Sequence, residues 1–273
     1  MLEHALDRAP WWAERWGVSG ALVLLLDFDG TLAPIVPHAG EAAMPAQTRA
    51  GLERLLAMTG VSAAVVSGRG LADVRERAGL PGIPYAGNHG MEIEGPGLRR
   101  IHPEALAARP ALEEARSRLE AALVGIPGAW TEDKGLTLSV HFRQSPDDQH
   151  ARIRQAVRAV AATLPSLRAT EGKMVVEVRP AVEWDKGRAV HFLLEQMRPP
   201  ADAPVLYIGD DRTDEDAFTA LRSRGWGEGV LVSDPPPALT AASSFLRNTL
   251  EVGRLFETLA DLGPSATPPQ PEG

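Results

Sequence analysis

Two aspartates lie two positions apart, directly after a run of apolar residues. Residues 22–26 read Leu-Val-Leu-Leu-Leu, and the sequence DFDGT follows, with Asp27 and Asp29 as its carboxylates. A charge buried without a partner is very costly, so these residues are not core filler. A divalent cation would keep both carboxylates ionised and leave one of them able to act as a nucleophile. For this motif alone, a capped strand end in a loop remains the alternative.

Three other segments carry residues suited to the same chemistry. Ser67 and Asp210 each follow a further apolar run, and Lys186 opens a predicted helix. Taken singly, Ser67 is an ordinary turn residue and Lys186 a solvated helix residue. The carboxyl ends of strands in an open parallel sheet meet at one crevice, where ligands bind. We therefore expect Asp27, Ser67 and Asp210 to lie together, with Lys186 within reach.

In this order and on these elements, the four segments resemble the motifs of the haloacid dehalogenase (HAD) superfamily, most of whose members are magnesium-dependent phosphotransferases. The resemblance implies a Rossmann-like parallel sheet core, the HAD fold. It also implies transfer of a phosphoryl group with Mg²⁺ as the cofactor. Such a transfer depends mostly on positioning and on stabilisation of negative charge.

The chemistry of phosphoryl transfer predicts a role for each of these side chains. Asp27 would attack phosphorus and become an aspartyl phosphate. Asp29 would protonate the leaving alkoxide and then deprotonate the attacking water. The hydroxyl of Ser67 and the ammonium of Lys186 would hold the phosphoryl oxygens.

The expected metal ligands are oxygen atoms, which Mg²⁺ prefers. We expect the ion to be bound by Asp27, by the main-chain carbonyl of Asp29 and by Asp210. Asp211 and Asp214 are candidates for supporting these ligands or for contacting metal-bound water.

Alternating apolar strands and amphipathic helices are the elements that would position these residues. Strand, helix, strand, helix, strand over residues 22–86 implies right-handed crossovers and a parallel sheet. The same rhythm resumes later in the chain, with helices predicted at 185–197, 214–221 and 246–259 and apolar strands at 205–208 and 230–232.

The pattern changes between residues 98 and 180. A helix predicted at 104–123 precedes two strands joined by the sequence DKG, which is typical of a hairpin, and apolar residues alternate with polar ones over 136–142. Such alternation indicates a sheet with one covered and one open face. A second helix and a second strand pair follow. The expected division is a catalytic core at 1–97 and 181–262, an inserted α+β cap domain at 98–180 and a disordered tail at 263–273.

Length, charge and composition limit the class of protein. The chain has 273 residues, a formal net charge of −8 and no cysteine. The negative charge argues against nucleic-acid binding, which needs a basic face. No apolar run is long enough to span a bilayer and no signal pattern is present, so we expect no membrane association and a cytoplasmic protein with a small-molecule substrate. The spacing of Trp12 and Trp16 predicts an N-terminal amphipathic helix packed on the body of the protein.

Within the superfamily, the chain resembles the trehalose-6-phosphate phosphatases from about residue 20 to about residue 260. The stretches that carry this resemblance are DFDGTLAPI from residue 27, SGR from 67, GNHG from 87, EDKGL from 132, HFR from 141, GK from 172, EVRP from 177, DKG from 185 and GDDRTDEDAF from 209. The resemblance implies hydrolysis of trehalose 6-phosphate to trehalose and phosphate, the last step of trehalose biosynthesis. Functional coupling to a trehalose-6-phosphate synthase would follow from that role.

The substrate-binding residues implied by this resemblance lie mostly in the cap. Five charged residues at or beside the cap hairpins are expected to hold the glucose units: Glu132, Lys134, Arg143, Lys173 and Glu177. Arg69, Asn88 and His89 are the expected substrate-binding residues of the core side. For each cap residue alone, an ordinary charged sheet face is the alternative.

Three other functions remain open at this point. The first is a phosphatase for another sugar phosphate, such as sucrose phosphate or mannosylglycerate phosphate. The second is a phosphomutase, which would return the phosphate to a sugar rather than to water. The third, a regulatory domain that only binds sugar phosphate, is disfavoured because binding alone needs neither Asp27 nor Asp29.

Overall fold

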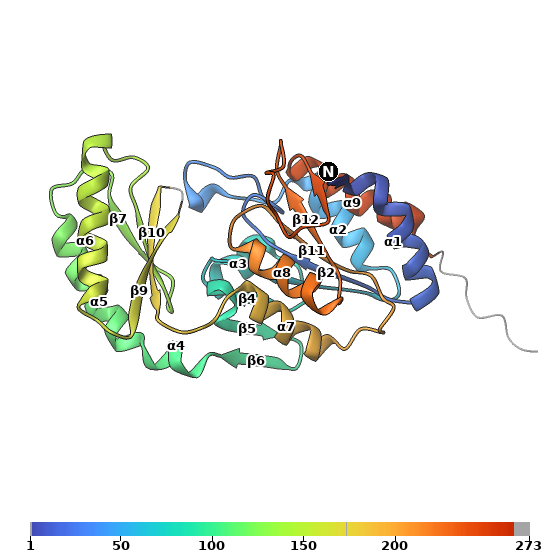
Figure 1. Ribbon diagram of the computed structural model, residues 1–273, viewed down its shortest axis with the longest axis horizontal. Helices are drawn as coiled ribbons and strands as arrows, with labels where there is room; N and C mark the ends of the chain where they lie inside the picture. Colours follow the sequence, from blue (N-terminus) through green and yellow to red (C-terminus); the bar gives the residue numbers. More distant parts are fainter. Residues whose placement is uncertain (1, 173, 265–273) are drawn as a thin grey trace, which may run out of the picture.

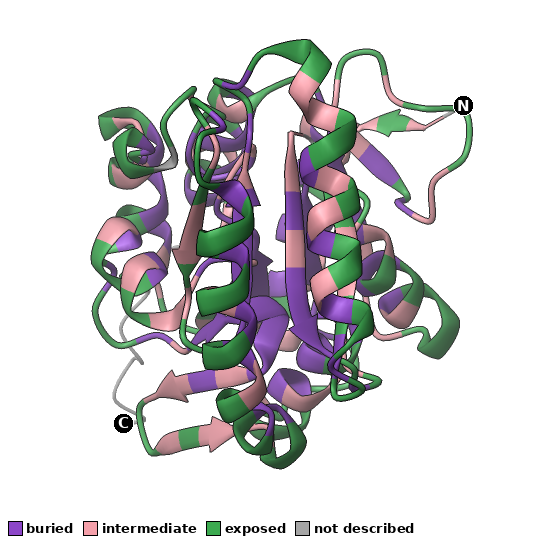
Figure 2. Cartoon of the chain, turned by 90° about the vertical axis from the view of Figure 1, so that its left-hand side faces the viewer, coloured by how far each residue is buried: buried purple, intermediate pink, exposed green. Residues whose placement is uncertain are grey.

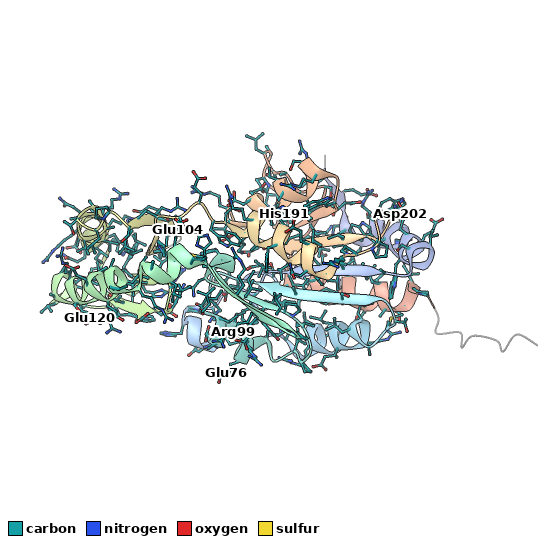
Figure 3. The ribbon with its side chains drawn as sticks, turned by 90° about the horizontal axis from the view of Figure 1, so that it is seen from below. Glu76, Arg99, Glu104, Glu120, His191 and Asp202 are labelled. Atoms are coloured by element: carbon teal, nitrogen blue, oxygen red, sulfur yellow. The ribbon has the colours of Figure 1, made fainter. Side chains whose placement is uncertain are left out.

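Two β-sheets, one of nine strands and one of four, organise the part of the chain that the structure describes. The structure is a computed structural model and describes residues 2–172 and 174–264. The two sheets lie side by side along the long axis of the molecule (Figure 1). Seen from below, Glu120 marks the end with the smaller sheet and Asp202 the opposite end (Figure 3).

The nine-stranded sheet has the order β1-β13-β12-β11-β2-β3-β4-β5-β6. Neighbours from β1 to β4 run parallel, and β5 and β6 extend the sheet in antiparallel fashion. The strands are β1 Glu3–His4, β2 Leu22–Leu26, β3 Val61–Val66, β4 Tyr85–Gly87, β5 Glu92–Gly95, β6 Leu98–Ile101, β11 Val205–Gly209, β12 Glu228–Val232 and β13 Ser244–Leu246. The predicted parallel-sheet core is confirmed.

The central strand β2 is buried on both faces, as its apolar sequence predicts. Leu24 and Leu26 pack into one hydrophobic cluster and Val23 and Leu25 into another, because successive side chains of a strand point to opposite faces. All five residues of β2 are buried. Burial on both sides requires a layer of helices over each face of the sheet.

Six helices supply these two layers. The helices α1 Ala5–Ser19, α2 Ala46–Leu56, α3 Leu71–Ala78 and α9 Thr249–Leu262 cover one face, and α7 Lys186–Met197 and α8 Asp214–Arg224 cover the other. Trp12 and Trp16 of α1 are fully buried, which confirms the predicted packing of this helix on the body of the protein. The closing helix begins at Thr249 rather than at residue 246, because the Asn248 side chain accepts hydrogen bonds from the Leu250 and Glu251 amides and caps it.

The second sheet is antiparallel and has the order β7-β8-β10-β9. Its strands are β7 Trp130–Asp133, β8 Leu138–His141, β9 Leu167–Gly172 and β10 Val175–Pro180, and its covering helices are α5 Arg109–Leu123 and α6 His150–Ala162. The apolar side chains of one sheet face form a single cluster with the inner faces of these helices. Figure 2 shows the helices with exposed outer surfaces and buried inner ones. This sheet with its two helices is called the cap below, and its uncovered side the open face.

The predicted helix over residues 104–123 is wrong as a single element. Two helices replace it, α4 Pro103–Ala107 and α5 Arg109–Leu123, which meet at Ala108. Pro110 is the physical reason, since a proline inside a continuous helix loses one backbone hydrogen bond and clashes with the carbonyl of Leu106. In the first turn of a new helix the same proline is well accommodated.

The shortest strands carry too little pattern to be predicted. Strands β1, β6 and β13 have two, four and three residues and were not expected from the sequence. A period-2 pattern needs about four to eight residues to be recognised. Short 3₁₀ turns at Ala39–Glu41, Asn88–Gly90 and Asp147–Gln149 complete the described elements. Residues 265–273 of the tail expected to be disordered lie outside the described residues. Across residues 2–172 and 174–264, no helix combines the length and apolar character needed to cross a membrane.

Candidate active site

The carboxyl ends of three adjacent strands place the chemically suited side chains together. Strands β11, β2 and β3 are neighbours in the sheet, and Asp210, Asp27 and Ser67 each follow directly after one of them. Asp27 and Ser67 are almost completely buried. Both line one cavity of about 550 Å³ between the core sheet and the open face of the cap.

Lys186 lies between two buried carboxylates. Its ammonium donates to Asp27 Oδ1 at 2.8 Å and to Asp214 Oδ1 at 2.7 Å. The Asp185 side chain caps the helix that begins at Lys186, by accepting a hydrogen bond from the Arg188 amide. The start of α7 and the end of β2 therefore bring a lysine and an aspartate that are 159 residues apart into direct contact.

Asp214 is fully buried and has several hydrogen-bond donors around it. Tyr207 donates its hydroxyl at 2.6 Å, and the amides of Asp210 and Asp211 each donate at 3.0 Å. Asp214 thus fixes the loop that carries Asp210 and also positions Lys186. Tyr207 has no role in the sequence-based prediction; its buried hydroxyl beside a carboxylate becomes visible only from the packing of β11 on α8.

Three carboxylates form a candidate metal-binding group. Oxygen atoms of Asp27, Asp210 and Asp214 lie within 4.8 Å of one another. Burial, then the neighbouring carboxylates, raise the pKa of Asp210 to about 8. Burial also raises the pKa of Asp27, although Lys186 opposes the effect. Such crowding of buried carboxylates is unfavourable without a cation.

Two further observations test whether these residues suit a metal ion. Asp210 Oδ1 is buried without a hydrogen-bond partner, and a bound cation would satisfy this oxygen. Gly30 has φ +81°, and a Cβ there would lie 2.1 Å from Asp210 Oδ2, so the glycine makes room for this carboxylate. An all-oxygen donor set of this kind fits Mg²⁺. The Asp211 carboxylate accepts from the Thr213 amide and hydroxyl, both at 2.7 Å, and lines the cavity from the side.

The Asp29 carboxylate lies apart from this acidic group. Arg69 donates to both of its oxygens, at 2.6 and 2.7 Å, and donates also to Asp73 at 2.6 Å. Burial alone would lower the pKa of Arg69, but its hydrogen bonds to Asp29 and Asp73 raise it overall. Arg69 is therefore a permanent cation that orients Asp29 at the cavity wall.

The opposite wall of the cavity is the open face of the cap. Strand pairing places side chains in rows across this face, because every second residue of each strand points the same way. One row contains Glu132, Ser139, Glu177 and Thr170, and the next contains Trp130, His141, Val175 and Gly172. Every residue of both rows lines the cavity.

Glu177 links the cap to the core. Its carboxylate lies 3.2 Å from His89 Nε2 and 3.7 Å from Lys134 Nζ. Burial would raise the pKa of Glu177, but His89 and Lys134 lower it to about 2. Lys134 also donates to the Gly68 carbonyl at 3.2 Å, so both side chains bridge the two walls of the cavity.

Asn88 is the expected substrate-binding residue that the structure places away from the cavity. It is fully buried and absent from the cavity lining. Its amide nitrogen donates to Glu92 at 2.7 Å and to the Lys134 carbonyl at 3.0 Å, and its oxygen accepts from Thr137 at 2.8 Å. Asn88 thus fastens the β7–β8 hairpin to the core.

The remaining expected residues divide into three groups. The first group lines the cavity and contains both expected substrate-binding and expected catalytic or metal-site residues: Asp27, Asp29, Ser67, Arg69, His89, Glu132, Lys134, Arg143, Glu177, Lys186 and Asp211. Asp210 and Asp214 belong to the acidic group with Asp27 and are not among the lining residues. Lys173 lies outside the described residues. Trp130, His141 and Thr170 are lining residues that the sequence analysis did not select, although their alternation with the buried cap residues places them on the open face.

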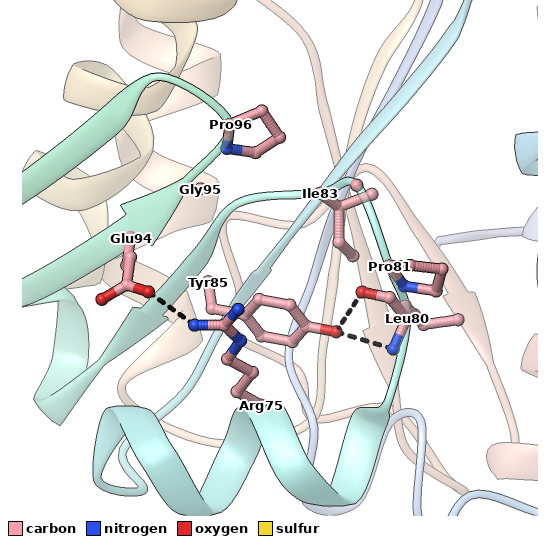
Figure 4. Close-up of a pocket in the computed structure, with 9 residues that line it drawn as sticks. Arg75, Leu80, Pro81, Ile83, Tyr85, Glu94, Gly95 and Pro96 are labelled. Carbon is pink, nitrogen blue, oxygen red and sulfur yellow. Dashed lines mark hydrogen bonds and ion pairs between the residues drawn. The ribbon is translucent and has the colours of Figure 1, made fainter.

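A second cavity, of about 320 Å³, is lined by residues of α3, β4 and β5 and of the loops beside them (Figure 4). Its polar groups pair among themselves. Arg75 donates to Glu94 at 2.5 Å, and the Tyr85 hydroxyl bonds the Leu80 amide and carbonyl, each at 2.8 Å. Among its lining residues no second carboxylate accompanies Glu94, so it offers neither a metal site nor a nucleophile with a neighbouring acid.

Comparison with known proteins places the site in context. Residues 25–247 match the model of a family described as trehalose-phosphatase. The chain is 42% identical over 239 residues to a probable trehalose-phosphate phosphatase 4 of Oryza sativa subsp. japonica, covering 85% of this chain and 64% of that protein. It is 41% identical over 245 residues to a trehalose-phosphate phosphatase of Mycobacterium avium, covering 87% and 62%. The chain therefore spans less than two thirds of the length of these two relatives.

Solved structures share the architecture. The C-terminal domain of Candida albicans trehalose-6-phosphate phosphatase aligns with a TM-score of 0.79 at 22% identity, covering 96% of this chain and 98% of that one. A trehalose-6-phosphate phosphatase of Aspergillus fumigatus aligns with a TM-score of 0.63 at 27% identity, covering 95% and 99%. The first of these likenesses, at its low identity, is evidence for the fold alone.

Proposed function

Since this chain belongs to the trehalose-phosphatase family, we propose that it hydrolyses trehalose 6-phosphate to trehalose and phosphate through a phosphorylated Asp27. The observation that carries the proposal is the buried Lys186, held between Asp27 and Asp214 at the floor of a cavity roofed by the polar open face of the cap. A nucleophile, an acid and a sugar-sized space thus share one site.

The first step forms a bond between an Asp27 oxygen and phosphorus and breaks the bond from phosphorus to the sugar oxygen. Asp29 donates a proton to that leaving oxygen. In the second step a water attacks phosphorus, Asp29 accepts its proton, and the Asp27 carboxylate leaves. Lys186 and Ser67, both at the cavity floor, stabilise the negative phosphoryl oxygens.

The residues that would hold Mg²⁺ are Asp27, Asp210 and the main-chain carbonyl of Asp29, with Asp211 and Asp214 supporting them. When bound, the ion would supply positive charge at the phosphoryl oxygens. The buried Asp210 Oδ1 without a hydrogen-bond partner supports this assignment.

Substrate recognition belongs to the cap in this proposal. Glu132, Lys134, Arg143 and Glu177 offer charged groups for the sugar hydroxyls from the cap side, and His89 and Arg69 from the core side. Asn88 contributes by holding the hairpin that carries Lys134. The division into a core at 1–97 and 181–262 and a cap at 98–180 is part of the proposal.

Phosphate release from trehalose 6-phosphate, measured with Mg²⁺ and after exhaustive chelation, tests this function. Sucrose phosphate, mannosylglycerate phosphate and glucose 6-phosphate serve as comparison substrates in the same assay. We expect the highest kcat/KM for trehalose 6-phosphate. A higher kcat/KM for another sugar phosphate would overturn the proposed substrate, and appearance of the phosphate on a second sugar instead of in solution would identify a phosphomutase. The cytoplasmic location and the coupling to a trehalose-6-phosphate synthase stay predictions.

A further inference from the structure

The open face of the cap has an aromatic end that the proposed chemistry does not use. We propose that Trp130, backed by His141, is the stacking platform for the hexopyranose ring that does not carry the phosphate. The proposal rests on the proposed function, because it assigns one ring of a disaccharide phosphate to this end of the cavity.

The indole of Trp130 is held in place from behind. Its ring lies over the imidazole of His141, with 4.3 Å between ring centroids and 18° between ring planes. His141 is anchored in turn, since its Nε2 lies 2.7 Å from Glu132 Oε2. The anchored imidazole covers one face of the indole, yet Trp130 keeps 49% of its surface exposed.

The position of Trp130 suits the second ring of a disaccharide. Trp130 pairs with His141 across two strands, and Glu132 pairs with Ser139 in the adjacent row. Rows two residues apart along a strand are separated by about 6.5–7 Å, which is on the order of one sugar ring. If the phosphorylated ring contacts the row of Glu132 and Glu177, its neighbour lies against the row of Trp130.

The loop after β2 adds apolar side chains to the cavity lining. Ile35, Val36 and Pro37, from the loop after β2, line the same cavity, and Ile35 is 59% exposed. That loop reaches toward the cap in Figure 1, and His38 lies 3.4 Å from Gln144 of the cap. A pyranose ring presents C–H groups on its faces and hydroxyls at its edge, so a cavity lined by an aromatic plane and by apolar side chains suits its faces. A role for Trp130 in cap packing alone does not account for this exposure, because about half of the residue's surface is open to solvent.

Three variants test the platform: Trp130→Ala, Trp130→Phe and, as a matched control, Trp11→Ala. Trp11 has a similar exposure, 42%, but lies on α1 against Arg8 and Arg15 and outside the cavity lining. Steady-state kinetics are measured on trehalose 6-phosphate and on p-nitrophenyl phosphate, with free trehalose as an inhibitor of the second reaction.

We expect Trp130→Ala to raise KM for trehalose 6-phosphate and the inhibition constant of trehalose on the order of tenfold, as loss of an aromatic stack would. Trp130→Phe should recover most of this loss, and Trp11→Ala should match the wild type. Trp11→Ala should hydrolyse p-nitrophenyl phosphate as the wild type does, and both Trp130 variants should lose less on this ester than on trehalose 6-phosphate. Equal losses on both substrates, or unchanged values for Trp130→Ala with trehalose 6-phosphate and trehalose, would overturn the platform.

Failure of the underlying function gives a different result. If the wild-type enzyme releases no phosphate from trehalose 6-phosphate, the proposed function fails whatever the variants do. The platform is then tested by inhibition of p-nitrophenyl phosphate hydrolysis. The inhibition constants of trehalose and sucrose are compared with that of glucose, in the wild type and in the variants. The platform is supported if the disaccharides inhibit more strongly than glucose and if only Trp130→Ala weakens their inhibition. Equal disaccharide inhibition in the wild type and in Trp130→Ala would overturn the platform.

Discussion

The guanidinium of Arg69 holds both carboxylate oxygens of Asp29, at 2.6 and 2.7 Å, while the same group donates to Asp73. A planar fork of this kind fixes the direction of a carboxylate as well as its charge. In the proposed reaction Asp29 must deliver a proton to one particular sugar oxygen. The pair therefore links the orientation of the acid to a residue that makes no bond to phosphorus.

Replacing Arg69 by lysine should separate orientation from charge. Lysine keeps the charge but cannot bind both oxygens of Asp29, so kcat on trehalose 6-phosphate should fall by about ten- to a hundredfold. Hydrolysis of p-nitrophenyl phosphate should fall less, because nitrophenolate leaves without a proton. Arg77→Lys is the matched control, since Arg77 also donates to Asp73, at 2.7 Å, while its other hydrogen bonds go to the Gly40 and Ala42 carbonyls and not to Asp29. Equal losses on both substrates for Arg69→Lys would argue that Arg69 acts on a step common to both, such as transfer to Asp27 or attack of water, rather than on protonation of the sugar oxygen.

Replacing Asp27 by asparagine should abolish turnover without unfolding the protein. The amide is a poor nucleophile but retains an oxygen that can accept from Lys186, so we expect kcat to fall more than about a thousandfold with little change in Tm. Activity and thermal unfolding are measured on the same preparation, with Asp202→Asn on the exposed end of the core as the control. Substantial turnover by Asp27→Asn would show that another residue is the nucleophile.

Metal removal should affect stability as well as activity. The carboxylates of Asp27, Asp210 and Asp214 repel one another, and a cation among them relieves this repulsion. Chelation should abolish phosphate release, and saturating Mg²⁺ should restore it and raise Tm by roughly 5 °C. Mn²⁺ or Co²⁺ should substitute in part. Unchanged activity after exhaustive chelation would remove the metal from the mechanism.

The pH dependence of stability should contain a contribution from Glu177. Its pKa is lowered from the ordinary value of 4.5 to about 2 in the folded protein, so it stabilises the fold above pH 4.5 and loses this effect as the pH falls toward 2. The free energy of unfolding of the wild type, relative to Glu177→Gln, should therefore decrease by about 1 kcal/mol between pH 6 and pH 4. Urea unfolding of both proteins at several pH values measures this difference. A difference that grows on acidification would contradict the pairing of Glu177 with His89 and Lys134.

Glu177→Gln also tests the division of work between cap and core. The amide cannot pair with His89 and Lys134 as the carboxylate does, so activity on trehalose 6-phosphate should fall while p-nitrophenyl phosphate hydrolysis persists. Equal losses on both substrates would mean that Glu177 acts through the docking of the cap.

Much of the core could be predicted from the sequence, because its signals are local. Five apolar residues followed by Asp27 and Asp29 specify a strand buried on both faces that ends in carboxylates. Parallel strands then direct the ends of β2, β3 and β11 to one edge of the sheet. The alternation of the cap strands likewise predicted an open and a covered face.

Only the tertiary structure decided which polar groups meet. Asn88 occurs in a stretch that resembles a substrate-binding motif, yet packing of the β7–β8 hairpin engages its side chain with Thr137 and the Lys134 carbonyl. The stack of Trp130 on His141 depends on hairpin register, since a shift of β7 by one residue would turn the indole to the covered face, away from His141. The periodicity of a helix or strand depends on residues that are neighbours in the sequence, so it can be recognised from the sequence. Contacts between distant residues depend on how whole elements pack, and a single sequence does not determine that packing by inspection.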